Sequence, residues 1–366
     1  PLLTPNDTNY STQWGFQDAD AGIRANQAWD VATGSGIIVA VLDTGITSHS
    51  DLNANVVAGY DFVSNATNAR DGNGRDSNAA DQGDWTTAGQ CYSGSPASNS
   101  SWHGTHVAGT VAAVTNNAKG VAGTAFNAKV MPVRVLAACG GSTSDIADAI
   151  IWSSGGTVSG VPTLSAANAA DVINMSLGGG GACPTTTQNA VNSAVSRGTT
   201  VVVAAGNSNA NASGFTPASC ANVVTVASVT SASARSSFSN YGTLIDVSGP
   251  GSSILSTLNS GTTTPGAESY ASYNGTSMAS PHVAGAVALV QSRRLALGLA
   301  LYTPAQVETQ LKNTAYALAG ACSGGCGAGI VNAKALVDAA GGTTTPPGSQ
   351  TYSNTADYTI GDNTTV

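Results

Sequence analysis

Four largely apolar runs rich in β-branched residues most constrain how this chain can fold. They are residues 37–42, 129–136, 171–175 and 200–205. A continuous apolar run of this length is typical of a strand buried on both faces of a parallel sheet. Helical patterns separate successive runs, at residues 102–114, 144–153 and 185–197. Strands that alternate with helices predict an α/β fold of three layers, α/β/α, with a mostly parallel central sheet.

Weaker patterns complete the expected body. Shorter strands are predicted at 223–228 and 244–247, and residues 1–30 form an N-terminal arm. Gly198 is placed to end the helix at 185–197. A terminal helix is expected at 303–314, because Thr303 is a good N-cap, Pro304 suits the first helical position and Gln306 completes a capping box.

The chain divides by composition near its end. Residues 1–340 form the expected main domain, interrupted at 61–101 by an insert rich in Asp, Asn and Gly. Residues 341–350 have the Gly, Thr and Pro content of a linker. Residues 351–366 are interpreted as the start of an incomplete β-rich module or a processed extension.

Polar residues follow three of the predicted strands. Asp43 follows the first run, Ser176 the third and Asn207 the fourth. In sheets of parallel strands, functional groups gather just beyond the carboxyl ends of the strands. These three positions are therefore expected at one edge of the sheet.

Ser277 precedes an alanine-rich, apolar stretch that is expected to be a buried helix. Free N–H groups and the helix dipole at such an N-terminus favour developing negative charge, which suits a nucleophile. Serine is also a preferred N-cap, so a purely structural role is the alternative. A catalytic role requires a base, an orienting acid and an oxyanion donor elsewhere in the chain.

The chain has four histidines that could supply the base. His282 lies five residues after Ser277 on the same expected helix, so it points elsewhere. His103 stands in the first turn of the helix at 102–114, near its exposed end, whereas His106 leads into the buried side. His103 is therefore the better base, His106 and His282 are expected to be structural, and His49 lies in a loop.

Charge and hydropathy narrow the class of protein. Only 9% of residues are charged and the net charge is −8. An acidic chain with few Lys and Arg argues against nucleic-acid binding, and no apolar run reaches the roughly 18 residues of a membrane span. We expect a secreted, processed protein from which a signal and a pro-segment have been removed.

Four motifs then occur in a characteristic order: DTG at 43–45, HGTHVAGT at 103–110, AAGN at 204–207 and NGTSMASPHVAGA at 274–286. In these motifs the chain resembles the subtilisin-like serine proteases, or subtilases, from about Trp14 to Asp338. The resemblance implies that Ser277 attacks the scissile carbonyl, His103 is the base, Asp43 orients the imidazole, and Asn207 stabilises the oxyanion with the Ser277 N–H.

The resemblance also implies a substrate cleft with backbone-lined walls and broad specificity, with a preference for apolar or aromatic residues before the cut. Two segments resemble the walls of the primary specificity pocket, and a third resembles the edge that pairs with an extended peptide. The residues implied are Ser176, Leu177, Gly178, Gly179, Ala204, Ala205, Gly206, Gly140, Gly141 and Ser142.

Calcium is the cofactor that the resemblance implies. Asp51 matches a carboxylate of a tight site, whose partners come from the loop at 114–121. Four carboxylates of the insert predict a second ion, because they would repel one another without a cation, and Asp246 resembles a ligand of a weaker site. The residues implied are Asp51, Thr115, Asn117, Val121, Asp71, Asp76, Asp81, Asp84 and Asp246.

Six cysteines suit an oxidising compartment but allow many pairings. Cys322 and Cys326 lie in one glycine-rich turn and are expected to pair locally. Our hypothesis for the whole chain is sequential pairing, as Cys91–Cys139, Cys183–Cys220 and Cys322–Cys326.

The main prediction is a secreted, monomeric, calcium-stabilised serine endopeptidase that acts on protein and peptide substrates and has its own pro-segment as inhibitor and folding aid. Two alternatives stay open. One is a zinc hydrolase using His103 and His106, although the chain has no HExxH pattern. The other is a non-catalytic binding module on a protease fold.

Overall fold

The computed structural model describes residues 3–341. The predicted linker beyond Gly341 and the predicted C-terminal segment at 351–366 lie outside the described residues. No helix within residues 3–341 is long and apolar enough to cross a membrane.

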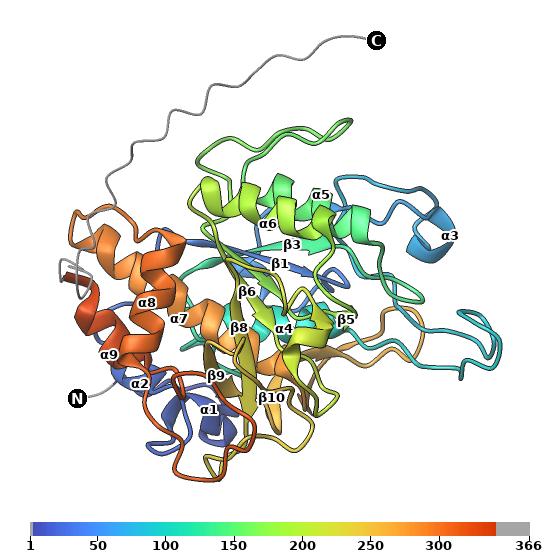
Figure 1. Ribbon diagram of the computed structural model, residues 1–366. Helices are drawn as coiled ribbons and strands as arrows, with labels where there is room; N and C mark the ends of the chain where they lie inside the picture. Colours follow the sequence, from blue (N-terminus) through green and yellow to red (C-terminus); the bar gives the residue numbers. More distant parts are fainter. Residues whose placement is uncertain (1–2, 342–366) are drawn as a thin grey trace, which may run out of the picture.

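A parallel sheet of seven strands forms the centre of the described region (Figure 1). In spatial order the strands are β2 (Tyr60–Asp61), β3 (Lys129–Arg134), β1 (Ile38–Asp43), β4 (Val172–Met175), β6 (Thr200–Ala204), β8 (Val224–Val229) and β9 (Val247–Pro250). Every pair of neighbours is parallel, which confirms the predicted sheet. The carboxyl ends of β1, β4 and β6 therefore meet at one edge.

Helices cover both faces of this sheet, as expected for three layers (Figure 1). The helices α4 (His103–Ala112) and α7 (Thr276–Ala296) pack on one face, and α5 (Thr143–Ser153) and α6 (Thr185–Ser196) on the other. Along β1 the buried side chains alternate: Val39 and Val41 join the core with α7, whereas Ala40 and Leu42 join the core with α5. This period of two explains why an apolar run without polar gaps forms a central strand.

Smaller helices surround α7 on one side of the molecule (Figure 1). The N-terminal arm supplies α1 (Trp14–Gln17) and α2 (Ala25–Ala28), and the C-terminal part supplies α8 (Pro304–Thr314) and α9 (Ala333–Asp338). The predicted capping box of α8 is present, with Thr303 and Gln306 exchanging side-chain and backbone hydrogen bonds.

Two predictions about strands differ from the structure. The strand expected at 244–247 instead runs from Val247 to Pro250, because Ile245 closes a turn onto Gly242 and the Asp246 carboxylate accepts the Thr225 N–H. An antiparallel hairpin, β10 (Ile254–Asn259) with β11 (Glu268–Tyr273), was not predicted. Strand β11 is largely solvent-accessible and carries no apolar run, so its sequence gives no strand signal.

The insert at 61–101 has little regular structure beyond α3 (Ala66–Ala69) and is anchored by one buried cation. Arg134, the last residue of β3, contacts Asp61 at 2.7 Å and Asp71 at 3.1 Å, and donates to the Ala69 carbonyl at 2.6 Å. Burial raises the pKa of Asp61 to about 7, while the Arg134 charge opposes that rise. Arg134 thus connects the start of the insert to the sheet.

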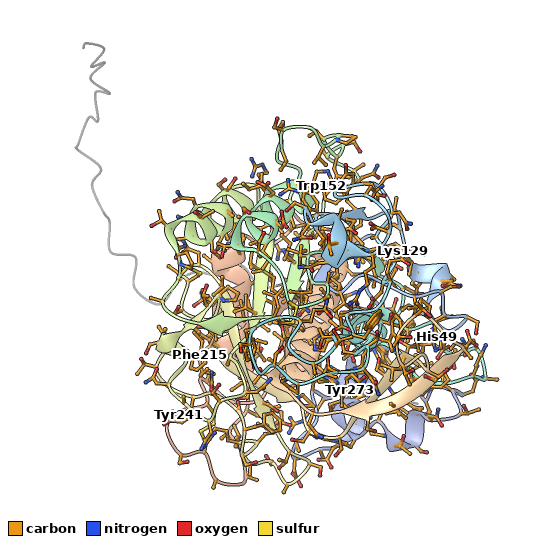
Figure 2. All side chains as sticks on the ribbon, turned by 90° about the vertical axis from the view of Figure 1, so that its right-hand side faces the viewer. His49, Lys129, Trp152, Phe215, Tyr241 and Tyr273 are labelled. Atoms are coloured by element: carbon orange, nitrogen blue, oxygen red, sulfur yellow. A yellow bond between two sulfur atoms is a disulfide. The ribbon has the colours of Figure 1, made fainter. Side chains whose placement is uncertain are left out.

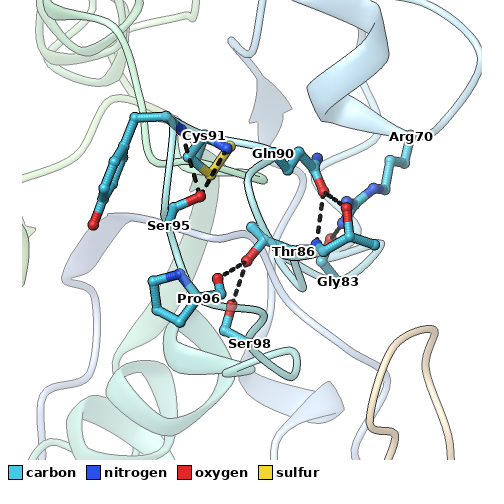
Figure 3. The surroundings of a disulfide bond; sticks show 11 residues. Arg70, Gly83, Thr86, Gln90, Cys91, Ser95, Pro96 and Ser98 are labelled. Atoms are coloured by element: carbon cyan, nitrogen blue, oxygen red, sulfur yellow. Dashed lines mark hydrogen bonds between the residues drawn. A yellow bond between two sulfur atoms is a disulfide. The ribbon is translucent and has the colours of Figure 1, made fainter.

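Disulfides join further segments, and the hypothesis of sequential pairing is confirmed. Cys91 pairs with Cys139, Cys183 with Cys220, and Cys322 with Cys326. The first bond fastens the far end of the insert to the loop after β3 (Figure 3).

We predict that Arg134→Met destabilises the fold by about 3–5 kcal/mol at pH 8, because it leaves Asp61 buried without its cation. This destabilisation should be smaller at pH 5, because the unpaired Asp61 carboxylate then takes up a proton and is buried in its neutral form. Urea unfolding at both pH values measures the effect. Arg197→Met is the control, because Arg197 is exposed and its guanidinium bonds only Ser193. Equal, pH-independent losses in the two variants would contradict the prediction.

Candidate active site

The site begins at the contact between the end of β1 and the start of α4. Asp43 is fully buried, and the two oxygens of its carboxylate lie 2.8 and 2.9 Å from His103 Nδ1. The Thr44 N–H donates to the same carboxylate at 2.8 Å. Because an ionised carboxylate only accepts hydrogen bonds, His103 donates from Nδ1 and, when neutral, keeps its lone pair on Nε2.

This contact depends on a close approach that only glycine permits. A Cβ on Gly104 would lie 2.2 Å from the Gly45 carbonyl oxygen and 3.2 Å from Asp43 Cβ. The HGT and DTG motifs are therefore complementary, since one glycine lets the first turn of α4 rest on the loop after β1.

The surroundings of His103 tune its basicity. Burial alone would lower the pKa of the imidazole. The charge and hydrogen bond of Asp43, helped by the charges of Asp84 and Asp81, reverse that effect, so the His103 pKa is raised above its ordinary value of 6.5. The protonated form is thereby favoured, as a base that carries a proton between two steps requires.

Ser277 stands in the first turn of α7 and faces the same cleft as His103. Its hydroxyl donates to the Ser176 carbonyl at 3.1 Å, and the Ser176 hydroxyl donates to the Ser277 carbonyl at 2.7 Å. In this arrangement the Ser277 hydroxyl is directed to the end of β4 rather than to His103. Catalytic hydrogen bonds are often not yet formed in an enzyme without substrate.

Asn207 lies just beyond β6 with its amide orientation fixed. Its side-chain oxygen accepts from the N–H and the hydroxyl of Thr276, at 2.9 and 3.0 Å. The amide nitrogen is thereby left for another acceptor. A Cβ on Gly275 would lie 3.5 Å from both this nitrogen and the Ser277 N–H nitrogen. The absence of a side chain at Gly275 keeps both donors accessible.

A cleft of about 1030 Å³ contains these groups. Its walls include the ends of β4 and β6, the Gly140 edge and the antiparallel pair of β5 (Gly179–Gly180) with β7 (Phe215–Thr216), where Phe215 is labelled in Figure 2. Of the predicted cleft residues, those that line it are Ser176, Leu177, Gly178, Gly179, Ala204, Ala205, Gly206, Gly140 and Gly141. Ser142 does not line it, because its hydroxyl caps α5 by accepting the Asp145 N–H.

The far end of the insert forms a wall that the sequence reasoning missed. Cys91, Tyr92, Ser95 and Pro96 line the cleft, and Tyr92 is 67% exposed. The loop holds its shape through the Ser95 hydroxyl, which accepts the Cys91 and Tyr92 N–H groups (Figure 3). A signal was present in the sequence, since a bond from Cys91 to Cys139 places this loop beside the Gly140 edge.

His106 and His282 have structural contacts, as predicted. His106 stacks on Tyr273 at 4.5 Å, and its Nε2 lies 2.9 Å from the Ala271 carbonyl oxygen. His282 is buried with Nδ1 2.7 Å from the Met278 carbonyl oxygen. Burial lowers the pKa of His106 to about 3 and that of His282 to about 4. His103 is bonded to Asp43, whereas His106 is bonded to the Ala271 carbonyl. These different partners argue against a zinc site built on the two histidines.

Asp51 is hydrogen-bonded to Asn117 and Val121, two of the residues of the predicted calcium loop. The Asn117 amide donates to Asp51 at 2.7 Å, and the Val121 N–H donates to the other Asp51 oxygen at 2.9 Å. The Thr115 hydroxyl is engaged within the loop, with Ala113 and Gly123. A further carboxylate, Asp7 of the N-terminal arm, lies near enough for its charge to raise the pKa of Asp51, although burial is the larger cause.

The carboxylates predicted for the second and third calcium sites are bonded to other partners. Within residues 3–341 no three His, Cys, Asp or Glu side chains gather as a metal site. The insert carboxylates take separate partners instead: Asp71 binds Arg134, Asp76 binds Asn73 and Asn78, Asp81 binds Thr44 and Gly83, and Asp84 binds Ser101. Asp246 is paired with Lys312 at 2.6 Å.

Comparisons with known proteins agree with this arrangement. Residues 34–350 match the model of the Subtilase family. An "Extracellular protease" of Xanthomonas campestris pv. campestris is 72% identical over 338 residues, which cover 92% of this chain and 57% of that protein. Subtilisin Savinase of Lederbergia lenta is 39% identical over 89% of this chain and 98% of its own.

A solved protease structure from Pseudoalteromonas arctica PAMC 21717 is similar, with a TM-score of 0.89 and 55% identity over 92% of this chain and 100% of its own. The matched part of the chain spans little more than half the length of the Xanthomonas protease. The motifs of this chain, its parallel sheet and the geometry around Asp43 and His103 are consistent with these similarities. The chain belongs to the subtilase family.

Proposed function

We propose that the chain is a secreted serine endopeptidase that hydrolyses peptide bonds through an acyl-enzyme on Ser277. The observation that carries the proposal is the buried Asp43–His103 pair at the edge of a cleft that also holds Ser277 and Asn207. Secretion and oxidative folding are supported by three disulfides and by relatives that are named extracellular.

The proposed reaction uses Ser277, His103 and Asn207 in turn. The Ser277 hydroxyl turns from Ser176 towards His103 and attacks the carbonyl carbon, while its proton moves to His103 Nε2. The oxyanion accepts hydrogen bonds from the Asn207 amide and the Ser277 N–H. The C–N bond then breaks as His103 returns the proton to the leaving amine. Water next attacks the acyl carbon and gives a proton to His103, and the bond to Ser277 breaks as His103 passes that proton to the Ser277 oxygen.

The cleft supports broad specificity. Its walls offer mainly backbone and small side chains, so they can pair with a peptide main chain without recognising much sequence. Phe215 and the Ala204–Gly206 segment give the primary pocket an apolar character, which favours apolar or aromatic residues before the cut. We also propose that the chain acts as a monomer and folds with the aid of its own pro-segment.

A calcium site is part of the proposal. Asp7 and Asp51 are buried, and one oxygen of Asp7 has no hydrogen-bond partner. Two buried carboxylates beside the Asn117 amide offer oxygen ligands, which suit Ca²⁺. When bound, the ion would neutralise the two carboxylates and fasten the N-terminal arm to the loop at 114–121. Asp7 was not predicted as a ligand, because it lies far from this loop in sequence.

The first prediction concerns the nucleophile. Ser277→Ala should lower kcat for casein hydrolysis by on the order of a million-fold, because no other hydroxyl takes the place of the attacking atom. Ser272→Ala, an exposed serine on β11, should keep full activity. A variant at Ser277 that still cleaves casein, with loss of activity only on zinc chelation, would instead support a zinc hydrolase. Wild type that binds casein without cleaving it would support a binding module.

The second prediction concerns pH. His103 must be neutral to accept a proton, and its pKa is raised, so kcat/KM should fall as pH drops through a value above 6.5. Asp43→Asn removes the nearest negative charge, which should move this acidic limb to lower pH and reduce the rate on the order of 10⁴-fold. A pH profile with an uncharged peptide substrate measures both effects. An acidic limb unmoved in Asp43→Asn would contradict the assignment of His103.

The third prediction concerns calcium. Chelation with EGTA should lower the Tm of wild type, because Asp7 and Asp51 then remain buried without a cation. Asp51→Asn should lose both calcium binding in a titration and the sensitivity of its Tm to EGTA. Asp338→Asn, at an exposed carboxylate on α9, should keep both. An unchanged wild-type Tm after complete calcium removal would refute this site.

A further inference from the structure

We propose that Asp81 and Asp84, two carboxylates of the insert, are positioning residues for the catalytic base. Each fixes a hydroxyl that in turn holds a backbone N–H of the first turn of α4. The inference rests on the proposed role of His103 as the base. It assigns to the acidic insert a function in catalysis that differs from the calcium binding expected from its sequence.

The first connection runs from Asp81 through Thr44 to Gly104. Asp81 is 2% exposed, and its carboxylate accepts the Thr44 hydroxyl at 2.6 Å and the Gly83 N–H at 2.8 Å. The Thr44 hydroxyl oxygen accepts the Gly104 N–H at 3.0 Å. Thr44 follows Asp43 and Gly104 follows His103, so this connection fastens together the two segments that carry the catalytic pair.

The second connection runs from Asp84 through Ser101 to His103. The Asp84 carboxylate accepts the Ser101 N–H at 2.6 Å and the Ser101 hydroxyl at 2.7 Å. The Ser101 hydroxyl oxygen lies 3.3 Å from the His103 N–H nitrogen, which donates to it. The backbone of the catalytic histidine is thus held by a serine whose own orientation is set at two points.

The start of α4 needs these connections because it has no ordinary cap. Its N-cap residue, Trp102, adopts a left-handed conformation with φ 50° and offers no side-chain cap. The first N–H groups of a helix have no partner within the helix. A hydroxyl has one proton, so donating it to a carboxylate leaves the lone pairs facing the N–H group. Asp81 and Asp84 therefore make Thr44 and Ser101 act as caps.

The same carboxylates add negative charge near the imidazole. The titratable groups that act on His103 are Asp43, Asp84 and Asp81, together with the neutral His106 on its own helix. Arg70 lies near Asp84, and Arg134 acts on Asp81. Asp84 gives the cleaner test of charge, because burial raises the pKa of Asp81 to about 7 and its charge is then only partly present at neutral pH.

The experiment separates charge from position with three variants. Asp84→Asn removes the charge but keeps one acceptor for Ser101, and Ser101→Ala removes the cap but keeps the charge. Asp148→Asn is the matched control, because it also removes one negative charge and loosens the insert, through Arg75, away from His103. For each variant, kcat, KM, the pH profile of kcat/KM and the Tm are measured in saturating calcium and in EGTA.

We expect Asp84→Asn to move the acidic limb to lower pH by on the order of half a unit. We expect Ser101→Ala to lower kcat about tenfold at the pH optimum, with KM and the limb unchanged, because misplaced catalytic groups lose rate rather than binding. Asp148→Asn should change neither the acidic limb nor kcat.

Several results would overturn the proposal. One is an equal limb shift in Asp148→Asn, and another is a Ser101→Ala variant with wild-type kcat. A limb shift in Asp84→Asn that appears only in EGTA would assign the insert to cation binding instead. If Asp84→Asn does not fold, Ser101→Thr serves as the second test: it keeps the hydroxyl and should restore kcat relative to Ser101→Ala, and equal kcat in the two would count against the cap.

Failure of the inference can be told from failure of the proposed function. If His103→Ala retained wild-type hydrolysis, His103 would not be the base and both would fail. If His103→Ala is inactive while Asp84 and Ser101 can be replaced without effect, only the positioning role fails.

Discussion

A buried carboxylate at the end of a strand needs a partner, and for Asp43 that partner is His103. A charge removed from water is costly unless it is hydrogen-bonded and paired. The Thr44 N–H and the His103 imidazole satisfy the Asp43 carboxylate, and this requirement fixes how α4 sits on β1. The parallel sheet then brings the ends of β4 and β6 to the same edge, so the remaining groups of the site follow from strand order.

The structure agrees with the predicted positions of those site residues whose placement has short-range causes. Asp43 ends a buried strand, Asn207 follows another, and Ser277 stands in the first turn of a buried helix, so each could be placed from local pattern alone. His103 could be chosen over His282 by helix geometry. The disulfide hypothesis was also correct: only Cys322 and Cys326 are close in sequence, and the other two bonds join cysteines 48 and 37 residues apart.

What the sequence could not predict depends on contacts distant in the chain. The hairpin of β10 and β11 has a polar strand, and its His106–Tyr273 stacking joins residues with no shared pattern. Asp246 resembled a cation ligand, yet α8 brings Lys312 to it. The insert carboxylates resembled a calcium loop because their sequence shows only their spacing, whereas their partners come from Thr44, Ser101 and Arg134 in other elements.

The scarcity of Lys and Arg limits how the buried carboxylates of this fold can be paired. With only 12 Lys and Arg against 20 Asp and Glu, buried carboxylates must find other partners. Asp61 forms an ion pair with Arg134, and Asp246 forms one with Lys312. Asp81 and Asp84 instead accept hydrogen bonds from hydroxyl groups. Asp7 and Asp51 lie near enough for the Asp7 charge to act on Asp51, and one oxygen of Asp7 has no hydrogen-bond partner. Within the described residues, no Lys or Arg forms an ion pair with either carboxylate. We therefore propose the divalent ion at Asp7, whose Oδ1 the chain's own donors leave unsatisfied, and at its neighbour Asp51, rather than where acidic residues are most dense.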